Sequence, residues 1–339
     1  MKSTFTSFAR PRGALLLSRD SALNLYGEPG LAEMAELTRL APPIDPQSLE
    51  SNLDSLAEAE VLFTGWGCPR IDTQMLAAAP RLKAIFFAGG TIRSWITPAV
   101  WARGITVSSA YGANAVPVSE YTLAAILFSL KRGWHYLARQ HRERIFPAPV
   151  IPSPGAYNST VGIISLGAIG RLVCERLRPF DLKVIAYDPL TLPEDAAQLG
   201  VSLVGLEELF SRSDVVSLHA PHLPATEGLV TGALLERLRT GATFINTARG
   251  TVVREDELTA VLAQRPDLTA VLDVLLHEPP NPANLLLQLP NVVLTPHIAG
   301  ALGPECQRLG RLMIEEFKRW QRSEPLQWQI TPEQSLLLA

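Results

Sequence analysis

The sequence predicts an α/β protein in which parallel sheets form two successive units. Short runs of apolar and β-branched residues alternate with longer helical stretches, as expected for strands that are joined by helical crossovers. A proline-rich segment interrupts this alternation once, and the alternation then starts again. The length of 339 residues is enough for about two domains.

In the first part of the chain, apolar runs bounded by turn residues predict strands, and longer amphipathic stretches predict helices. The predicted strands are residues 14–17, 61–65, 82–88 and 105–110, and the predicted helices are residues 31–40, 72–79 and 97–103. A single long helix is predicted from about Val116 to Arg144. Pro117 suits its first turn, where an N–H group would have no partner, and Glu120 suits the positive end of its dipole.

Residues 147–155 contain four prolines within eight residues, which predicts a connecting loop, because such a segment forms neither a helix nor a central strand. The elements resume after this loop. The predicted strands are residues 161–165, 183–188, 214–220, 243–247, 268–274 and 292–295, and the predicted helices are residues 168–177, 255–264 and 304–322.

Composition excludes several classes of protein. Apolar residues make up 47% of the chain, and 30 basic against 33 acidic residues give a net charge of −3, which argues against a dedicated nucleic-acid binder. We found no run of about 18 apolar residues and expect no membrane span. Three widely spaced cysteines predict neither disulfides nor a zinc ribbon and favour the cytoplasm. His219 and His222 lack further ligands nearby, so no metal is expected.

Residues 161–171 read VGIISLGAIGR, between a predicted strand and a predicted helix. In this context a glycine-rich turn predicts a dinucleotide site. Gly167 would let the backbone approach a pyrophosphate, and Gly170 would let the helix pack close to the strand. Ser165 stands where the motif has its first glycine, so its side chain would strain the turn or crowd the cofactor. The competing interpretation is an ordinary β–α turn.

Asp188 ends the next apolar run, 18 residues beyond Gly170. A carboxylate there accepts hydrogen bonds from the adenosine ribose hydroxyls and repels a 2′-phosphate. Residues 189–197 contain no Arg or Lys, so NAD is favoured over NADP. The alternative is a solvated carboxylate.

Three polar residues, Arg249, Glu278 and His297, follow predicted strands. The carboxyl ends of parallel strands meet at one edge of a sheet, so these side chains are expected to converge. Together they suit carbonyl reduction: a guanidinium clamps a 2-oxo acid, an imidazole transfers a proton, and a carboxylate orients the imidazole. Surface ion pairs and a loop histidine are the competing interpretations, and His277 is a rival acid–base group.

Four motifs occur in the same order as in a known family. They are LGAIGR at 166–171, NTARG at 246–250, LDV at 272–274 followed by Glu278-Pro279, and PNVVLTPHIAG at 290–300. From about Leu62 to Cys306 the chain resembles the D-isomer-specific 2-hydroxyacid dehydrogenases, which include D-lactate, glyoxylate/hydroxypyruvate and 3-phosphoglycerate dehydrogenases and related corepressors. The resemblance implies that Arg249 binds substrate, that His297 is the acid–base group and that Glu278 is its partner.

The resemblance also implies the remaining site residues. The cofactor-binding positions are Gly167, Ala168, Ile169, Gly170, Asp188, His219, Ala220, Pro221, Thr226, Thr247, Ala248, Asp273 and Gly300. The substrate-binding positions are Gly89, Gly90, Thr91 and Asn114. The substrate loop has Gly-Gly-Thr where the family more commonly has Gly-Val-Gly, so analogy does not identify the acid.

The architecture implied by the resemblance is two doubly wound domains, with a Rossmann NAD domain (117–302) inserted into a flavodoxin-like substrate domain (1–116 and 303–339). NAD is the implied cofactor, a small 2-oxo or 2-hydroxy acid is the implied substrate, and the implied assembly is a homodimer through the cofactor domain. Trp134 is either an interface or pocket residue or part of the core.

Two other functions stay open. The first is an NAD(H)-responsive binding protein similar to the family's corepressors, which would show little turnover. The second is a formate dehydrogenase. Glu278 argues against it, because the family's formate enzymes carry Gln at that position.

Overall fold

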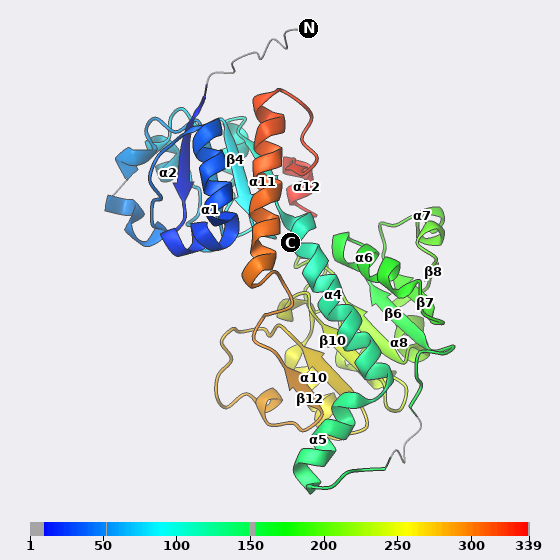
Figure 1. Cartoon of the computed structure of the whole chain (residues 1–339). Helices are drawn as coiled ribbons and strands as arrows, with labels where there is room; N and C mark the ends of the chain where they lie inside the picture. The colour runs from blue at the N-terminus through cyan, green and yellow to red at the C-terminus, as the bar shows by residue number, and fades with distance from the viewer. Residues whose placement is uncertain (1–9, 52, 149–152, 338–339) are drawn as a thin grey trace. The chain divides into compact units, whose positions relative to one another are not determined.

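The computed structural model describes residues 10–51, 53–148 and 153–337 (Figure 1). The chain divides into two compact units, Met1–Asn114 with Ala301–Ala339 (unit 1) and Ala115–Gly300 (unit 2). The boundary between them falls inside one helix, α4 (Tyr111–Leu130). Part of the predicted proline-rich loop, residues 149–152, lies outside the described residues.

Unit 1 has a six-stranded sheet in the order β13-β5-β4-β3-β1-β2. The order β2-β1-β3-β4-β5 is the flavodoxin-like doubly wound order, and these five strands are parallel. The short β13 pairs antiparallel with β5 at the edge, which periodicity did not predict. The strands are β1 (Arg12–Leu16), β2 (Arg39–Leu40), β3 (Val61–Gly65), β4 (Ala84–Ala88), β5 (Thr106–Ser109) and β13 (Gln329–Ile330).

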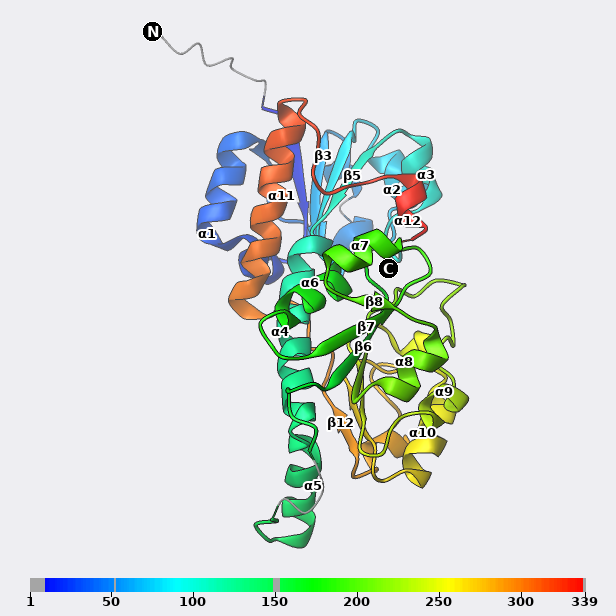
Figure 2. The ribbon, with the colours of Figure 1, turned by 90° about the vertical axis from the view of Figure 1, so that its right-hand side faces the viewer.

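Helices cover both faces of this sheet, and its central strands β3 and β4 are accordingly buried at every position. α1 and α11 lie side by side on one face, and α2 and α3 cover the other (Figures 1 and 2). The helices are α1 (Arg19–Leu37), α2 (Thr73–Ala78), α3 (Pro98–Ala102), α11 (Cys306–Gln321) and α12 (Pro332–Ser335), with 3₁₀ turns at Pro46–Ser51, Leu53–Leu56 and Gly303–Glu305.

Unit 2 has a seven-stranded parallel sheet in the order β12-β11-β10-β9-β6-β7-β8. Counted from β6, this is the Rossmann order 3-2-1-4-5-6 with one further strand. The strands are β6 (Thr160–Ile164), β7 (Lys183–Tyr187), β8 (Ser202–Leu203), β9 (Val215–Leu218), β10 (Thr243–Asn246), β11 (Thr269–Leu272) and β12 (Val292–Leu294).

Two apolar clusters, one on each face, hold the helices of unit 2 against this sheet. Figure 2 shows α8, α9 and α10 on one side of the strands and α4 and α6 on the other. The helices after α4 are α5 (Gly133–Glu143), α6 (Ala168–Leu177), α7 (Pro193–Gln198), α8 (Leu206–Arg212), α9 (Gly232–Glu236) and α10 (Glu255–Gln264), with 3₁₀ turns at Gly250–Val252 and Leu285–Leu287.

The predicted helix from 116 to 144 is wrong in two respects. α4 begins at Tyr111, so Pro117 lies inside the helix and Glu120 pairs with Arg176 at 3.1 Å instead of capping the N-terminus. The chain then breaks after Leu130, where Arg132 takes the left-handed conformation (φ 54°) that precedes α5. Likewise, the predicted helix 31–40 belongs to α1, which begins at Arg19, and its last two residues form β2.

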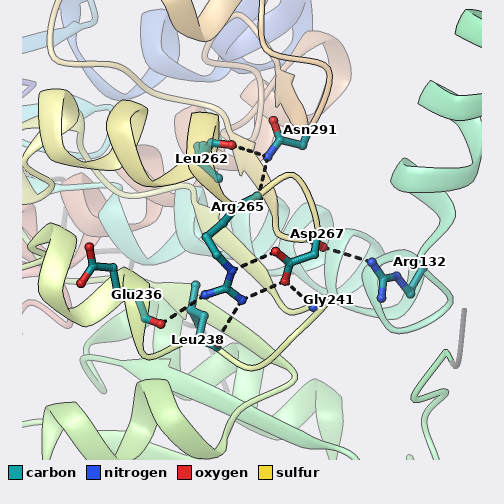
Figure 3. Close-up of polar contacts among 8 residues, drawn as sticks. All are labelled: Arg132, Glu236, Leu238, Gly241, Leu262, Arg265, Asp267 and Asn291. Atoms are coloured by element: carbon teal, nitrogen blue, oxygen red, sulfur yellow. Dashed lines mark hydrogen bonds and ion pairs between the residues drawn. The ribbon is translucent and has the colours of Figure 1, made fainter.

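Arg132 explains the break between α4 and α5. It is buried, and its Nη2 donates to the backbone oxygen of Asp267 at 3.1 Å. Arg265 holds both carboxylate oxygens of Asp267 at 2.8 Å, and the N–H of Gly241 donates to one of them (Figure 3). These contacts fix the start of α5 to the loop before β11.

By length and composition alone, α4 is long and apolar enough to cross a membrane. However, 56% of its most apolar window is buried inside the protein, as is usual for a core helix. A search of the sequence for uninterrupted apolar runs does not single out this helix.

Candidate functional site

Arg249, Glu278 and His297 lie in the loops that follow β10, β11 and β12, which are neighbours in the sheet of unit 2. His297 Nδ1 is hydrogen-bonded to Glu278 Oε2 at 2.7 Å. The other carboxylate oxygen of Glu278 accepts from the N–H of Leu275 at 3.0 Å. The partner of His297 is therefore Glu278, and Nε2 is the ring nitrogen left for a ligand.

Arg249 lies in the same group. It is partly buried, and its Nη1 donates to the backbone oxygen of Ala248 at 2.6 Å. Burial lowers the pKa of Arg249 from its usual value, and the nearby carboxylate of Glu278 acts in the opposite direction. A guanidinium stays protonated under these conditions, so the group combines a cation with a proton-transfer pair.

Two residues without a predicted role shape the Arg249 loop. The buried Asn246 side chain accepts from the N–H of Ala248 at 2.9 Å and donates to the Arg249 oxygen at 3.0 Å. A Cβ on Gly250 would lie 2.0 Å from the Leu275 carbonyl carbon, so only glycine allows the two loops to approach. Both residues belong to the NTARG motif, and this motif is the feature of the sequence that could have indicated their roles.

Asp273 is buried at the end of β11 and holds the loop that carries His297. Its carboxylate accepts from Thr295 Oγ1 at 2.7 Å and from the N–H groups of Ile298 and Ala299 at 2.8 and 2.9 Å. Its backbone oxygen accepts from the N–H of His297 at 3.0 Å. In the structure Asp273 thus organises this loop, whereas the resemblance gave it only a place beside the cofactor.

The turn from β6 to α6 fits a pyrophosphate. Gly167 precedes α6 without a side-chain cap, and a Cβ there would have no atom within 4 Å, so the helix N-terminus is open. A Cβ on Gly170 would lie 2.0 Å from the Ser165 oxygen, so glycine is required for this close approach. Ser165 has φ 76°, a left-handed conformation that favours glycine. Ala168 and Ile169 form the first turn of α6.

The Asp188 carboxylate accepts hydrogen bonds from two backbone segments, one after β6 and one after β7. Oδ2 accepts from the N–H of Leu166 at 2.6 Å and lies 3.4 Å from Ser165 Oγ. Oδ1 accepts from the N–H groups of Leu190 and Thr191 at 2.8 and 3.0 Å. These four contacts use about all the lone pairs of a carboxylate, so little capacity is left for a further donor.

The segment after β9 contains a buried histidine. His219 Nε2 is 2.9 Å from Ser217 Oγ, and its Nδ1 is buried without a hydrogen-bond partner in the described structure. Burial lowers the pKa of His219 to about 3, so the ring is neutral. Thr226 closes the following turn by accepting from the N–H of Leu223 at 2.9 Å. Ala220 is buried and Pro221 half-buried.

The other predicted cofactor positions lie close to the proposed catalytic loops. Thr247 is buried after β10 with its Oγ1 3.2 Å from Thr122 Oγ1, and Ala248 is buried next to it. Gly300 ends unit 2, three residues after His297. Among the described residues, no group of three or more potential metal ligands was found.

The predicted substrate positions belong to unit 1. Gly89, Gly90 and Thr91 follow β4, and Ser109 Oγ lies 3.0 and 2.7 Å from the oxygens of Gly89 and Gly90. Asn114 adjoins this loop: a Cβ on Gly90 would lie 3.3 Å from its Nδ2. Ser109 had no predicted role, since its contribution depends on strand pairing.

Comparisons with known proteins show which family this chain resembles. Residues 124–299 match the family model described as "D-isomer specific 2-hydroxyacid dehydrogenase, NAD binding domain". The D-3-phosphoglycerate dehydrogenase of Mycobacterium tuberculosis is 32% identical over 81% of this chain and 52% of its own length. The chain thus spans about half the length of the curated D-3-phosphoglycerate dehydrogenases that it matches. The (S)-sulfolactate dehydrogenase of Chromohalobacter salexigens is 32% identical over 74% of this chain and 81% of its own length.

Among solved structures, the NAD-complexed D-isomer specific 2-hydroxyacid dehydrogenase from Lactobacillus delbrueckii ssp. bulgaricus has a TM-score of 0.79, at 20% identity, covering 94% of this chain and 100% of that one. This likeness confirms the predicted fold class. The chain therefore belongs to the D-isomer specific 2-hydroxyacid dehydrogenase family, and residues 124–299 are its NAD binding domain.

Proposed function

We propose that the protein is an enzyme that interconverts a 2-oxo acid and a D-2-hydroxy acid with NAD as the cofactor. The observation that carries this proposal is the 2.7 Å hydrogen bond between His297 and Glu278, next to Arg249, at the carboxyl edge of an NAD-binding sheet. We further propose that residues 1–116 and 303–339 act as the substrate domain and 117–302 as the cofactor domain. A cytoplasmic location stays a prediction of the sequence.

In the proposed mechanism, bound NADH supplies the hydride. Arg249 binds the carboxylate and oxo group of the acid and polarises the carbonyl. Protonated His297 donates from Nε2 to the carbonyl oxygen during reduction, and the neutral ring takes that proton back during oxidation. Glu278 keeps a proton on Nδ1 and stabilises the imidazolium, so that Nε2 faces the reacting oxygen.

The other predicted residues have binding roles in this proposal. The backbone N–H groups at 89–91 and the amide of Asn114 would hold the substrate carboxylate. The open N-terminus of α6, with Gly167, Ala168, Ile169 and Gly170, would bind the pyrophosphate. Asp188 would bind the ribose, and the segments at 219–226, 247–248, 273 and 300 would line the remaining cofactor site.

The decisive test is NADH oxidation with glyoxylate, hydroxypyruvate, pyruvate, phenylpyruvate, 2-oxoglutarate and phosphohydroxypyruvate, with NADPH in parallel. Turnover of at least one acid, faster with NADH, is the expected result. His297→Gln should then lower kcat by about 10²- to 10⁴-fold, the usual contribution of a general acid–base, and leave NADH affinity within about twofold. NADH binding without turnover of any acid would contradict the enzyme and favour a corepressor-like binding protein.

We also propose a homodimer through unit 2. Four large apolar side chains are exposed to solvent here: Phe128 near the end of α4, Leu137 on α5, and Ile145 and Phe146 just after α5. Trp134, in contrast, packs edge-on against Phe128 at 4.5 Å and lines a cavity of about 310 Å³, so it is partly a packing residue. Light scattering should give twice the chain mass, and Leu137→Glu with Phe146→Ser should give a monomer; a wild-type monomer would refute the dimer.

A further inference from the structure

Tyr121 on α4 is linked to the loop that carries His297, although neither the motifs nor the proposed mechanism include it. Its hydroxyl oxygen lies 2.8 Å from Thr295 Oγ1, across 174 positions in the sequence. Thr295 in turn donates to Asp273 Oδ1 at 2.7 Å. Three residues, one on α4, one directly after β11 and one directly after β12, thus form one hydrogen-bonded chain within unit 2.

The direction of these hydrogen bonds follows from chemistry. A hydroxyl has one proton, and Thr295 gives it to the Asp273 carboxylate, which also accepts from the N–H groups of Ile298 and Ala299. Thr295 Oγ1 can therefore only accept from Tyr121, whose phenol is the donor. Burial raises the pKa of Tyr121, the charge of Asp273 acts in the same direction, and the Thr295 hydrogen bond opposes both, so the phenol keeps its proton at neutral pH.

The hydrogen bonds that link Tyr121, Thr295 and Asp273 hold a backbone segment that is strained. His297 has φ 54°, in the left-handed region, which costs a non-glycine residue about 1 kcal/mol or more. Asp273 supplies three contacts to this turn: its backbone oxygen accepts from the N–H of His297, and its carboxylate accepts from the next two N–H groups. The N–H of His297 also donates to the backbone oxygen of Thr295 at 2.9 Å. A rotated Asp273 side chain would lose these carboxylate contacts and release the turn.

We propose that Tyr121 is a positioning residue for His297: its hydroxyl fixes the Thr295 hydroxyl toward Asp273 and thereby holds the His297 turn in place. This inference rests on the proposed function only in assigning His297 the proton transfer. The alternative is that Tyr121 merely packs against the apolar cluster of α4, where its ring also lies. Tyr121→Phe separates the two, because it keeps the ring and removes the hydroxyl.

The kinetic test compares Tyr121→Phe and Thr295→Val in the full-length protein, using the acid that the wild type reduces best. Each variant should lower kcat about three- to tenfold and change its pH profile, with KM for the acid and the NADH Kd within about twofold. The double variant should lose no more than the worse single variant, because both break one chain of bonds. Thr295→Ser keeps a hydroxyl at this position and should keep the wild-type kcat. Tyr157→Phe removes the hydroxyl of an exposed tyrosine and is the matched control for Tyr121→Phe.

A second measurement does not depend on turnover. With histidine labelled in ¹³C and ¹⁵N, the imidazole signals of His297, assigned through His297→Gln, should shift in Tyr121→Phe while those of exposed His141 do not. Wild-type kcat at every pH, or an unshifted His297 ring, would overturn the positioning role. If the wild type reduces no acid, the proposed function fails on its own, and the His297 signals still decide the role of Tyr121.

Discussion

Ser165 combines a left-handed backbone with a side chain directed at the residue expected to bind ribose. Its φ of 76° favours glycine, and its Oγ lies 3.4 Å from Asp188 Oδ2, which is the longest of the four carboxylate contacts. Ser165→Gly should therefore relieve strain and free one lone pair of Asp188. We expect the NADH Kd to fall about two- to fivefold, or up to about 1 kcal/mol.

Fluorescence titration with NADH checks this prediction, and Ser165→Ala is the control, since it removes the hydroxyl but keeps the strained Cβ. Folding stability should change little, because relief of about 1 kcal/mol of strain is offset by the greater flexibility of glycine in the unfolded chain. Unchanged or weaker NADH binding in Ser165→Gly would mean that the hydroxyl is accommodated.

His219 should make folding stability depend on pH. Burial lowers its pKa from 6.5 to about 3, so between these values the unfolded chain binds one proton more than the folded chain. The stabilisation is thus complete above about pH 6.5 and is lost as the pH falls. From this residue alone, linkage predicts that the free energy of unfolding falls by about 2 kcal/mol between pH 7 and pH 5.

Urea unfolding at both pH values tests this effect. His219→Gln removes the buried titrating ring and with it this contribution to the pH dependence. Between pH 7 and pH 5 the wild type should therefore lose about 2 kcal/mol more of its free energy of unfolding than the variant does. His141→Gln, at an exposed position, should retain the wild-type dependence. If the free energy of unfolding changes equally with pH in the wild type and in His219→Gln, the ring is not held neutral.

At the scale of elements, α5 depends on the buried contacts of Arg132 with the Asp267 loop (Figure 3). A Cβ on Gly241 would lie 1.9 Å from Arg132 Nη1, at a position where φ is 78°. Gly241→Ala must therefore displace the guanidinium as well as strain the backbone. We expect it to lower the free energy of unfolding by at least about 2 kcal/mol.

The chain offers a matched control. Gly200 has nearly the same backbone, φ 75°, but a Cβ there meets no atom within 4 Å. Gly200→Ala should cost only the left-handed penalty of about 1 kcal/mol. Equal losses in the two variants, measured by urea unfolding, would show that the Arg132 contacts add nothing to stability.

The same contacts explain where sequence-based prediction succeeded and failed. The bounds of α6 and α10 match the predicted helices, because their start and stop signals lie within or next to each segment. The break between α4 and α5 depends on Arg132 meeting Asp267, 135 positions away, which no local pattern reveals. The same reason applies at the site: His297 and Glu278 follow adjacent strands, whereas the contact of Tyr121 with Thr295 needs the folded sheet.

At the scale of the whole molecule, the two units differ in how the chain supplies their cores. Unit 2 is continuous, and residues from α4 onward complete its apolar clusters. Unit 1 needs two distant segments: Phe317 of α11 packs against Phe63 and Phe86, with ring centroids 5.3 and 5.6 Å away. Without α11, the part of this sheet face that α1 does not cover would be exposed to water.

A fragment of residues 111–300, which keeps α4 intact, should therefore fold cooperatively and bind NADH with an affinity close to that of the full chain. It should not reduce any 2-oxo acid, because the loop at 89–91 that we assign to the substrate carboxylate lies in unit 1. Residues 1–114 alone should not fold, since they lack α11 and β13. Circular dichroism melting, NADH fluorescence and the acid panel test all three expectations. Turnover by the 111–300 fragment would place the whole substrate site in unit 2 and refute the role of the 89–91 loop. A fragment that melts without cooperativity would instead show that unit 2 needs unit 1 to fold.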